Sequence, residues 1–156
     1  METLRALWKQ LDAAAAGPYP LAALLGALAI PAQCAEIEHP ECSTAADYQR
    51  WFDTWVAPTY IEHPDLQPVL DGETCYAYRL ALRRNGHRSD EYLPVRFVVG
   101  HPDVTMHRIA FDGVLHIEIR PFVRDVIEGA ERWLLQYMET NPSRPAASAM
   151  LAAWFD

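Results

Sequence analysis

Residues 44–56, TAADYQRWFDTWV, carry the clearest periodicity in the chain and decide its fold class. Apolar side chains recur there at intervals of three and four residues, at Tyr48, Trp51, Phe52, Trp55 and Val56. This spacing places them on one face of an α-helix, which we expect to lie in the core or in a subunit interface. Thr44 followed by Asp47 is typical of a capping box, with aspartate in place of the usual Glu or Gln, and predicts where the helix begins.

Further helices are predicted on both sides of this segment. They cover residues 2–15, 21–30, 71–86, 121–140 and 148–155. Residues 21–30 are apolar almost all round, so this helix should be central to the bundle, and Pro31 is expected to kink or restart it. Asp71 is the expected N-cap of the fourth of the chain's long helices. Pro121 occupies the position that proline favours at a helix start, and Asp125 is expected on the solvent side of the helix that follows.

The pattern of apolar residues changes after residue 94 and predicts strands. Residues 95–99 are rich in valine and phenylalanine, which indicates one strand. Residues 106–111 and 114–119 flank Asp112-Gly113, a strong signal for a hairpin with a two-residue turn. We therefore expect a small antiparallel meander ahead of the last long helix.

The two faces of the predicted hairpin differ in chemistry. The register pairs His107 with Glu118 and places His116 on the same face. Two imidazoles and a carboxylate could bind a metal or transfer a proton, but solvated sheet positions have the same composition. No further ligand is identifiable beside them, so no metal site is predicted. Arg108 falls on the opposite, apolar face, where it must reach the sheet edge or find a partner.

Composition indicates a folded globular protein with one domain over residues 1–156. Apolar residues make up 51% of the chain, and the net charge of −8 excludes a broad basic surface for nucleic acid. Cys34, Cys42 and Cys75 form no CxxC pair and lack partners at zinc-ligand spacing, so a reduced, cytoplasmic protein is the simpler expectation. The apolar stretch 21–32 starts too late for a signal segment and is too short to span a membrane.

Motifs of the common nucleotide-dependent enzymes and hydrolases are absent from the sequence. The chain contains no GxGxxG, no GxxxxGKS/T, no HExxH and no GxSxG. No run of glycines could surround phosphates. We therefore expect no cofactor.

Residues 70–89, LDGETCYAYRLALRRNGHRS, gather basic side chains and a histidine at one helix end. Arg79 and Arg83 lie one turn apart on the edge of this helix, where two like charges repel by roughly 0.2–0.5 kcal/mol. Arg84 and Arg88 extend the same basic segment. An acidic group from elsewhere in the chain or a phosphate would relieve the repulsion, while a solvated or salt-bridged helix edge is the plain alternative.

Several blocks of the chain are similar to one known group of proteins. The blocks are residues 30–40, residues 48–52 (YQRWF), residues 70–79 (LDGETCYAYR) and residues 120–135 with Trp133. Together they resemble small uncharacterised bacterial proteins related to HEPN domains, over most of residues 20–135.

This resemblance implies a helical bundle that is often dimeric. Active HEPN domains are ribonucleases in which an arginine and a histidine meet across the dimer, the arginine stabilising the phosphorane while the histidine moves a proton. Arg79 matches the family arginine, whereas Arg84 stands where the family has its histidine. The nearest histidine is His87, which keeps a four-residue spacing from Arg83. The resemblance therefore implies a catalytic pair that is broken or displaced.

We accordingly expect an α+β domain, a predominantly helical, HEPN-like bundle with a small antiparallel β-meander before the main C-terminal helix. The leading hypothesis is a homodimeric module that binds RNA or a partner protein without catalysis, with Arg83, Arg84 and Arg88 as nucleic-acid contacts. The alternatives are a metal-independent ribonuclease using Arg79 and His87, and an interaction or structural domain with no nucleic-acid role. Neither a metal nor a membrane is expected as a partner.

Overall fold

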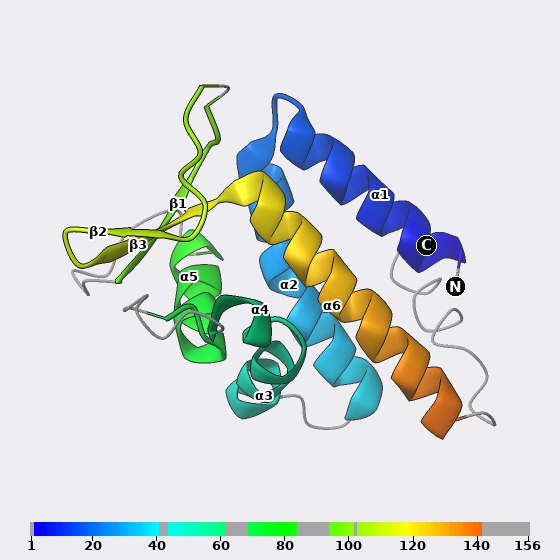
Figure 1. Ribbon diagram of the computed structural model, residues 1–156. Coiled ribbons are helices and arrows are strands. Elements are labelled where there is room, and N and C mark those ends of the chain that lie inside the picture. Colours follow the sequence, from blue (N-terminus) through cyan, green and yellow to red (C-terminus); the bar gives the residue numbers. More distant parts are fainter. Residues whose placement is uncertain (1, 41–43, 62–68, 84–93, 102, 142–156) are drawn as a thin grey trace.

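The computed structural model describes residues 2–40, 44–61, 69–83, 94–101 and 103–141. Within these residues the chain is mainly helical, with a small sheet ahead of the last helix (Figure 1). The elements are α1 (Glu2–Ala16), α2 (Pro20–Glu38), α3 (Ala45–Trp55), α4 (Pro58–Ile61), α5 (Gly72–Arg83), β1 (Val95–Val98), β2 (Ile109–Phe111), β3 (Val114–Glu118) and α6 (Ile119–Thr140). The predicted short helix over residues 148–155 lies outside the described residues.

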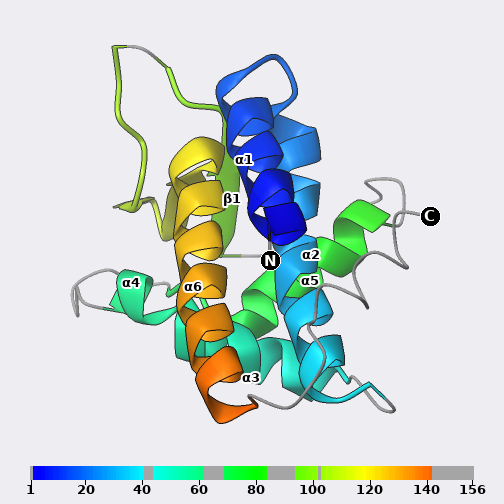
Figure 2. The same ribbon diagram turned by 90° about the vertical axis from the view of Figure 1, so that its right-hand side faces the viewer.

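Helix α2 is the centre of the bundle, as its apolar sequence predicts. It contacts α1, α3, α5 and α6, and Figure 2 shows it running between α1, α5 and α3. Pro31 lies inside this helix and is buried. The helix continues past it to Glu38, without the predicted restart. The expectation that this stretch is too short to span a membrane was wrong: with 19 residues α2 is long and apolar enough by length and composition, but half of it is buried inside the bundle.

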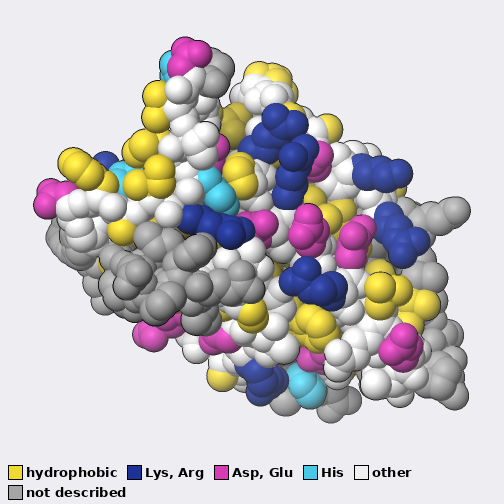
Figure 3. All heavy atoms as spheres, viewed as in Figure 1, with side chains coloured by type: hydrophobic (Ala, Val, Ile, Leu, Met, Phe, Trp, Pro, Cys, Tyr) yellow, Lys and Arg dark blue, Asp and Glu magenta, His cyan; other side chains and the backbone are white. Residues whose placement is uncertain are grey.

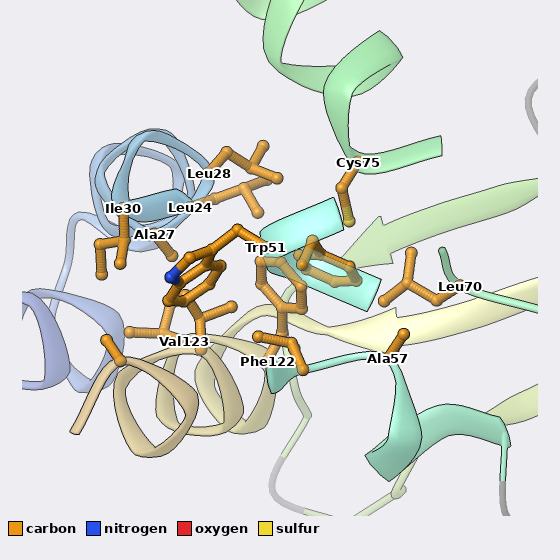
Figure 4. Packing of buried hydrophobic residues seen from close by; sticks show 14 of the residues in the cluster. Leu24, Ala27, Leu28, Ile30, Trp51, Ala57, Leu70, Cys75, Phe122 and Val123 are labelled. Carbon is orange, nitrogen blue, oxygen red and sulfur yellow. The ribbon is translucent and has the colours of Figure 1, made fainter. Parts of the chain in front are cut away.

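Helix α3 presents its aromatic face to the core. The predicted capping box is present: the Asp47 backbone N–H donates to Thr44 Oγ1 (3.3 Å), and the Thr44 backbone N–H donates to Asp47 Oδ2 (2.9 Å). Trp51 and Phe52 are buried, and Figure 4 shows the Trp51 ring between apolar side chains of α2 and Val123 of α6. Each large apolar side chain buried in this way contributes roughly 1.5–3 kcal/mol to folding.

The sheet differs from the predicted meander. Its order is β1-β3-β2, and β1 pairs parallel to β3 while β2 pairs antiparallel to it, so the sheet is mixed. Strand β3 is the most buried of the three, with Leu115, His116 and Ile117 buried, and it takes the central position between two neighbours. Strand β2 is short and exposes Phe111, which suits an edge.

The hairpin itself has the predicted turn and register. Ile109 pairs with His116 and Phe111 with Val114. Asp112 and Gly113 have φ values of 51° and 72°, the left-handed backbone that a two-residue turn of this kind requires. Two boundaries were predicted wrongly. Strand β2 begins only at Ile109, because Arg108 has a φ of 60° and interrupts the extended backbone, and α6 begins before Pro121.

Two glycines let other helices approach the backbone of α3 closely. A Cβ atom on Gly72, the first residue of α5, would lie 2.5 Å from the carbonyl oxygen of Gln49. A Cβ atom on Gly129 of α6 would lie 2.8 Å from the carbonyl oxygen of Trp55. Both carbonyl oxygens belong to the backbone of a packed helix. Neither can make room for a Cβ atom unless α3 itself shifts.

Replacing Gly72 with alanine should therefore weaken the fold. We expect Gly72→Ala to lower the free energy of unfolding by about 2 kcal/mol, measured by urea titration, because the added methyl group pushes α5 away from α3. The matched control is Gly17→Ala in the exposed turn after α1, where the nearest atom is 3.2 Å from the new Cβ. A change below about 0.5 kcal/mol is expected there. Equal losses of unfolding free energy in the two variants would contradict the close approach of α5 to the α3 backbone.

Candidate functional site

Helix α5 positions the candidate basic site, and its start is fixed by two aspartates. The Asp71 carboxylate accepts from the Thr74 backbone N–H at 2.8 Å, which confirms Asp71 as the N-cap. The Gly72 backbone N–H donates to Asp53 Oδ1 of α3 at 2.7 Å. These contacts anchor the first turn of α5 on α3, so the direction in which its later turns project is set by α3.

Arg79 lies on an aromatic ring and has no acidic partner in the part of the chain that the structure describes. Its guanidinium carbon is 5.7 Å from the centroid of the Tyr48 ring, and the residue is half-buried. Among the described residues no carboxylate lies within ion-pair distance of Arg79. Tyr48 is itself fixed, because its hydroxyl donates to the Leu28 carbonyl at 3.0 Å. Burial raises the pKa of Tyr48, which keeps its ring neutral beneath the cation.

The other predicted basic residues are placed only in part. Arg83 is exposed in the last turn of α5, one turn beyond Arg79, and has no carboxylate partner among the described residues. Arg84, His87 and Arg88 lie outside the described residues. The structure therefore gives Arg79 and Arg83 a common helix edge by their spacing, and the geometry of the Arg79–His87 pair stays a prediction.

The face predicted to join two histidines and a carboxylate does not assemble. His116 is buried, with 8% of its surface exposed, and its Nδ1 lies 3.2 Å from the Val114 carbonyl oxygen. The Glu118 carboxylate accepts from the Met106 backbone N–H. His107 lies outside β2 and contacts α6 instead. In the described part of the chain no group of three His, Cys, Asp or Glu side chains could hold a metal ion.

A polar cluster that the sequence did not predict forms around Asp125. The Tyr60 hydroxyl donates to Asp125 Oδ2 at 2.6 Å, and Arg108 Nη2 donates to the same oxygen at 3.1 Å. His107 Nε2 lies 3.7 Å from it. The Arg108 guanidinium also lies over the Tyr60 ring, 4.9 Å from its centroid. We call these four residues the Asp125 cluster; it joins α4, the segment before β2 and α6.

The protonation state of this cluster follows from its hydrogen bonds. Burial by itself would raise the pKa of Asp125, but the contacts from His107, Tyr60 and Arg108 outweigh it and leave that pKa lowered. Arg108 Nε donates to His107 Nε2 at 3.1 Å, and the other ring nitrogen of His107 is Nδ1. That Nδ1 is buried and has no hydrogen-bond partner among the described atoms.

The Asp125 cluster links α4, the segment before β2 and α6 through contacts to one carboxylate oxygen. One carboxylate oxygen already receives contacts from three side chains, which leaves it little capacity for a substrate. The prediction that Asp125 faces solvent was wrong, because the loop before β2 folds back over α6. The expectation that Arg108 must find a partner was correct. The position of this arginine on the apolar face of the predicted hairpin was the only feature of the sequence that pointed to the Asp125 cluster.

The Asp125 cluster makes stability depend on pH in a definite direction. Because the pKa of Asp125 is lower in the folded chain than its ordinary value of about 4, its stabilisation is present above about pH 4 and is lost as the pH falls through the folded pKa. We expect Asp125→Asn to lower the free energy of unfolding by about 2 kcal/mol near neutral pH and by much less near pH 2.5, measured by urea titration at both pH values.

The control for this prediction is Asp103→Asn. The Asp103 side chain is 84% exposed, and its ion-pair contact is to His101 at 3.8 Å. It should change stability little at either pH. A destabilisation by Asp125→Asn that is the same at both pH values would show that the carboxylate charge is not what stabilises the cluster.

No protein-family model, curated protein or solved structure matches this chain. Its function is therefore inferred from its own side chains and their contacts, together with the resemblance carried by the sequence blocks.

Proposed function

We propose that this chain is a HEPN-like, homodimeric module that binds single-stranded RNA along α5 without cleaving it. The binding surface, which we call the basic edge, consists of Arg79 and Arg83 with Arg84 and Arg88 following in the sequence. The observation that carries the proposal is the position of Arg79, whose guanidinium lies on the Tyr48 ring with no described carboxylate to neutralise it.

A guanidinium held in this way suits recognition of a nucleotide. Stacking on Tyr48 restricts the arginine, while its N–H groups, which lie in the plane of the guanidinium, stay able to donate to phosphate oxygens. Tyr76 packs edge-on against Tyr48, with ring centroids 5.2 Å apart, and is half-buried on the same helix as Arg79. Proteins that bind single-stranded nucleic acids combine basic side chains that contact phosphates with aromatic rings on which bases stack. An arginine next to a partly accessible aromatic ring provides both.

The distribution of charge restricts where such binding could occur. The chain carries a net charge of −8, yet residues 79–88 contain four arginines and no acidic residue. On the face seen in Figure 3, by contrast, basic and acidic side chains are interspersed along α1 and α6. Arg124 of α6, for example, pairs with Asp12 of α1 at 2.8 Å. Long-range repulsion by the acidic remainder limits affinity, while the arginine–phosphate contacts make binding weaken as the salt concentration rises.

The same proposal excludes catalysis on chemical grounds. The resemblance implies that a histidine moves the proton from the position that Arg84 occupies in the matching block, and an arginine stays protonated at every relevant pH. A metal-independent ribonuclease that uses Arg79 with His87 is kept as the competing outcome of the experiment.

The cysteines suit the cytoplasmic location that we propose. Cys34 and Cys75 are buried free thiols whose pKa values are raised by burial.

RNA binding should depend on the basic edge alone. We expect a short, labelled single-stranded RNA to bind the protein in fluorescence anisotropy, with affinity that falls steeply between about 50 and 200 mM salt. Replacing Arg79 and Arg83 together with glutamine should weaken binding roughly tenfold, because two phosphate contacts are lost. The control replaces Arg5 and Lys9, two exposed cations on α1, and removes the same charge with little effect.

Each alternative gives a different result in this assay. Cleavage of the RNA without metal, abolished by His87→Ala, would overturn the non-catalytic proposal in favour of the ribonuclease. Absent binding, or equal losses in the α5 and α1 double variants, would overturn the RNA proposal and favour a protein-interaction domain. Sedimentation equilibrium tests the homodimer separately, and a monomer at all concentrations would contradict that part.

A further inference from the structure

A second candidate site lies at the opposite end of α6 from the sheet. A pocket of about 260 Å³ opens there between the C-terminal ends of α2 and α6 and the end of α3, which Figures 1 and 2 show at the same end of the bundle. Its walls include Glu38 from α2, Trp55 from α3, and Trp133, Tyr137 and Asn141 from or just after α6. The pocket shares no residue with the basic edge of α5.

Two partly exposed aromatic rings line the pocket, those of Trp55 and Tyr137, and Trp133 lies behind them with 1% of its surface exposed. Trp133 and Tyr137 stack on each other, with ring centroids 5.3 Å apart and an angle of 27° between the planes. Trp55 lines the pocket from α3 and is half-buried. The face of an aromatic ring carries partial negative charge and attracts a cation, most strongly when water is displaced.

A carboxylate is fixed in the same pocket. The Trp133 indole N–H donates to Glu38 Oε1 at 2.6 Å, which holds the side chain in place and leaves its second oxygen without a partner among the described residues. No Lys or Arg in the described part of the chain lies within ion-pair distance of Glu38. Its negative charge is therefore not balanced by the protein's own basic groups there.

The ends of the surrounding helices add to this negative potential. Helices α2, α3 and α6 all terminate at the pocket, and none has a basic residue in its last turn. The carbonyl ends of helices carry partial negative charge, which basic residues commonly offset. The partial negative charge at the end of α3 is offset in part, because Arg132 Nη2 donates to the Trp55 carbonyl at 2.7 Å. His39, at the end of α2, is the other basic side chain nearby and is exposed.

We propose that this pocket binds a methylated or quaternary ammonium group. The pocket contains one carboxylate, and no group of three His, Cys, Asp or Glu that could hold a metal ion occurs among the described residues. A quaternary ammonium ion is large and weakly hydrated, so it loses little on leaving water and gains contact with the rings of Trp55 and Tyr137 beside the Glu38 carboxylate. The group can come from a free choline-like molecule or from a methylated lysine of another protein.

Titration with choline tests the charge requirement. Binding is followed through the indole N–H signals in ¹H–¹⁵N spectra, in which the Trp133 signal should shift because its N–H bonds to the Glu38 carboxylate. The comparison ligand is 3,3-dimethyl-1-butanol, which has the shape of choline without its charge. It should bind at least about tenfold more weakly. Nε-trimethyllysine amide, compared with unmodified lysine amide, tests the protein-derived source.

Two matched variants identify the residues responsible. Glu38→Gln keeps an oxygen to accept from Trp133 but removes the charge, and it should weaken choline binding roughly tenfold. Glu36→Gln makes the same change on the same helix outside the pocket and should have no effect. Trp55→Leu should also weaken binding, with its thermal unfolding measured to show that the fold is kept.

The proposal has clear contrary outcomes. Equal binding of choline and its neutral analogue, equal effects of the two glutamate substitutions, or no shift of the indole signals at any choline concentration would each overturn it. Because RNA binding is measured on a different surface, these outcomes leave the proposed function of α5 untouched.

Discussion

Helix α2 has almost no polar face, and the other helices of the bundle pack around it and bury much of its apolar surface. It contacts α1, α3, α5 and α6, and the residues from Ala23 to Ile37 that face them are buried. Removing such a helix from water supplies a large share of the hydrophobic stabilisation available to a chain of this size. The same requirement explains why Pro31 is tolerated inside it, since packing on several sides compensates for one missing backbone hydrogen bond.

Three arginines of this chain show how tertiary contacts decide the role of a charge. Arg108 is neutralised by Asp125 and helps to hold the loop before β2 on α6, and Arg124 pairs with Asp12 of α1. Arg79 rests on an aromatic ring instead and keeps an unbalanced charge among its described neighbours. Net charge alone does not distinguish these cases, because each depends on which side chain from a distant element lies within a few ångströms.

The helix ends contribute to function as much as the helix faces. Gly72 at the start of α5 packs against the α3 backbone and thereby directs Arg79 over Tyr48. The C-terminal ends of α2, α3 and α6 meet around Glu38 and two tryptophans, where partial negative charges accumulate. The two candidate sites thus lie on different parts of the bundle. One offers positive charge to a polyanion, and the other offers negative potential to a cation.

The sequence by itself determined features that depend on neighbours a few residues apart: the aromatic helix of residues 45–55, its Thr44 capping box, the Asp71 cap, and the hairpin turn at Asp112-Gly113 with its register. Only the tertiary structure decided that β3 is central and pairs parallel with β1, that Asp125 is half-buried beneath the segment before β2, and that His116 leaves solvent. The physical reason is range: backbone caps and turns are set by local hydrogen bonds, whereas strand order and charge pairing depend on distant segments that local periodicity does not encode.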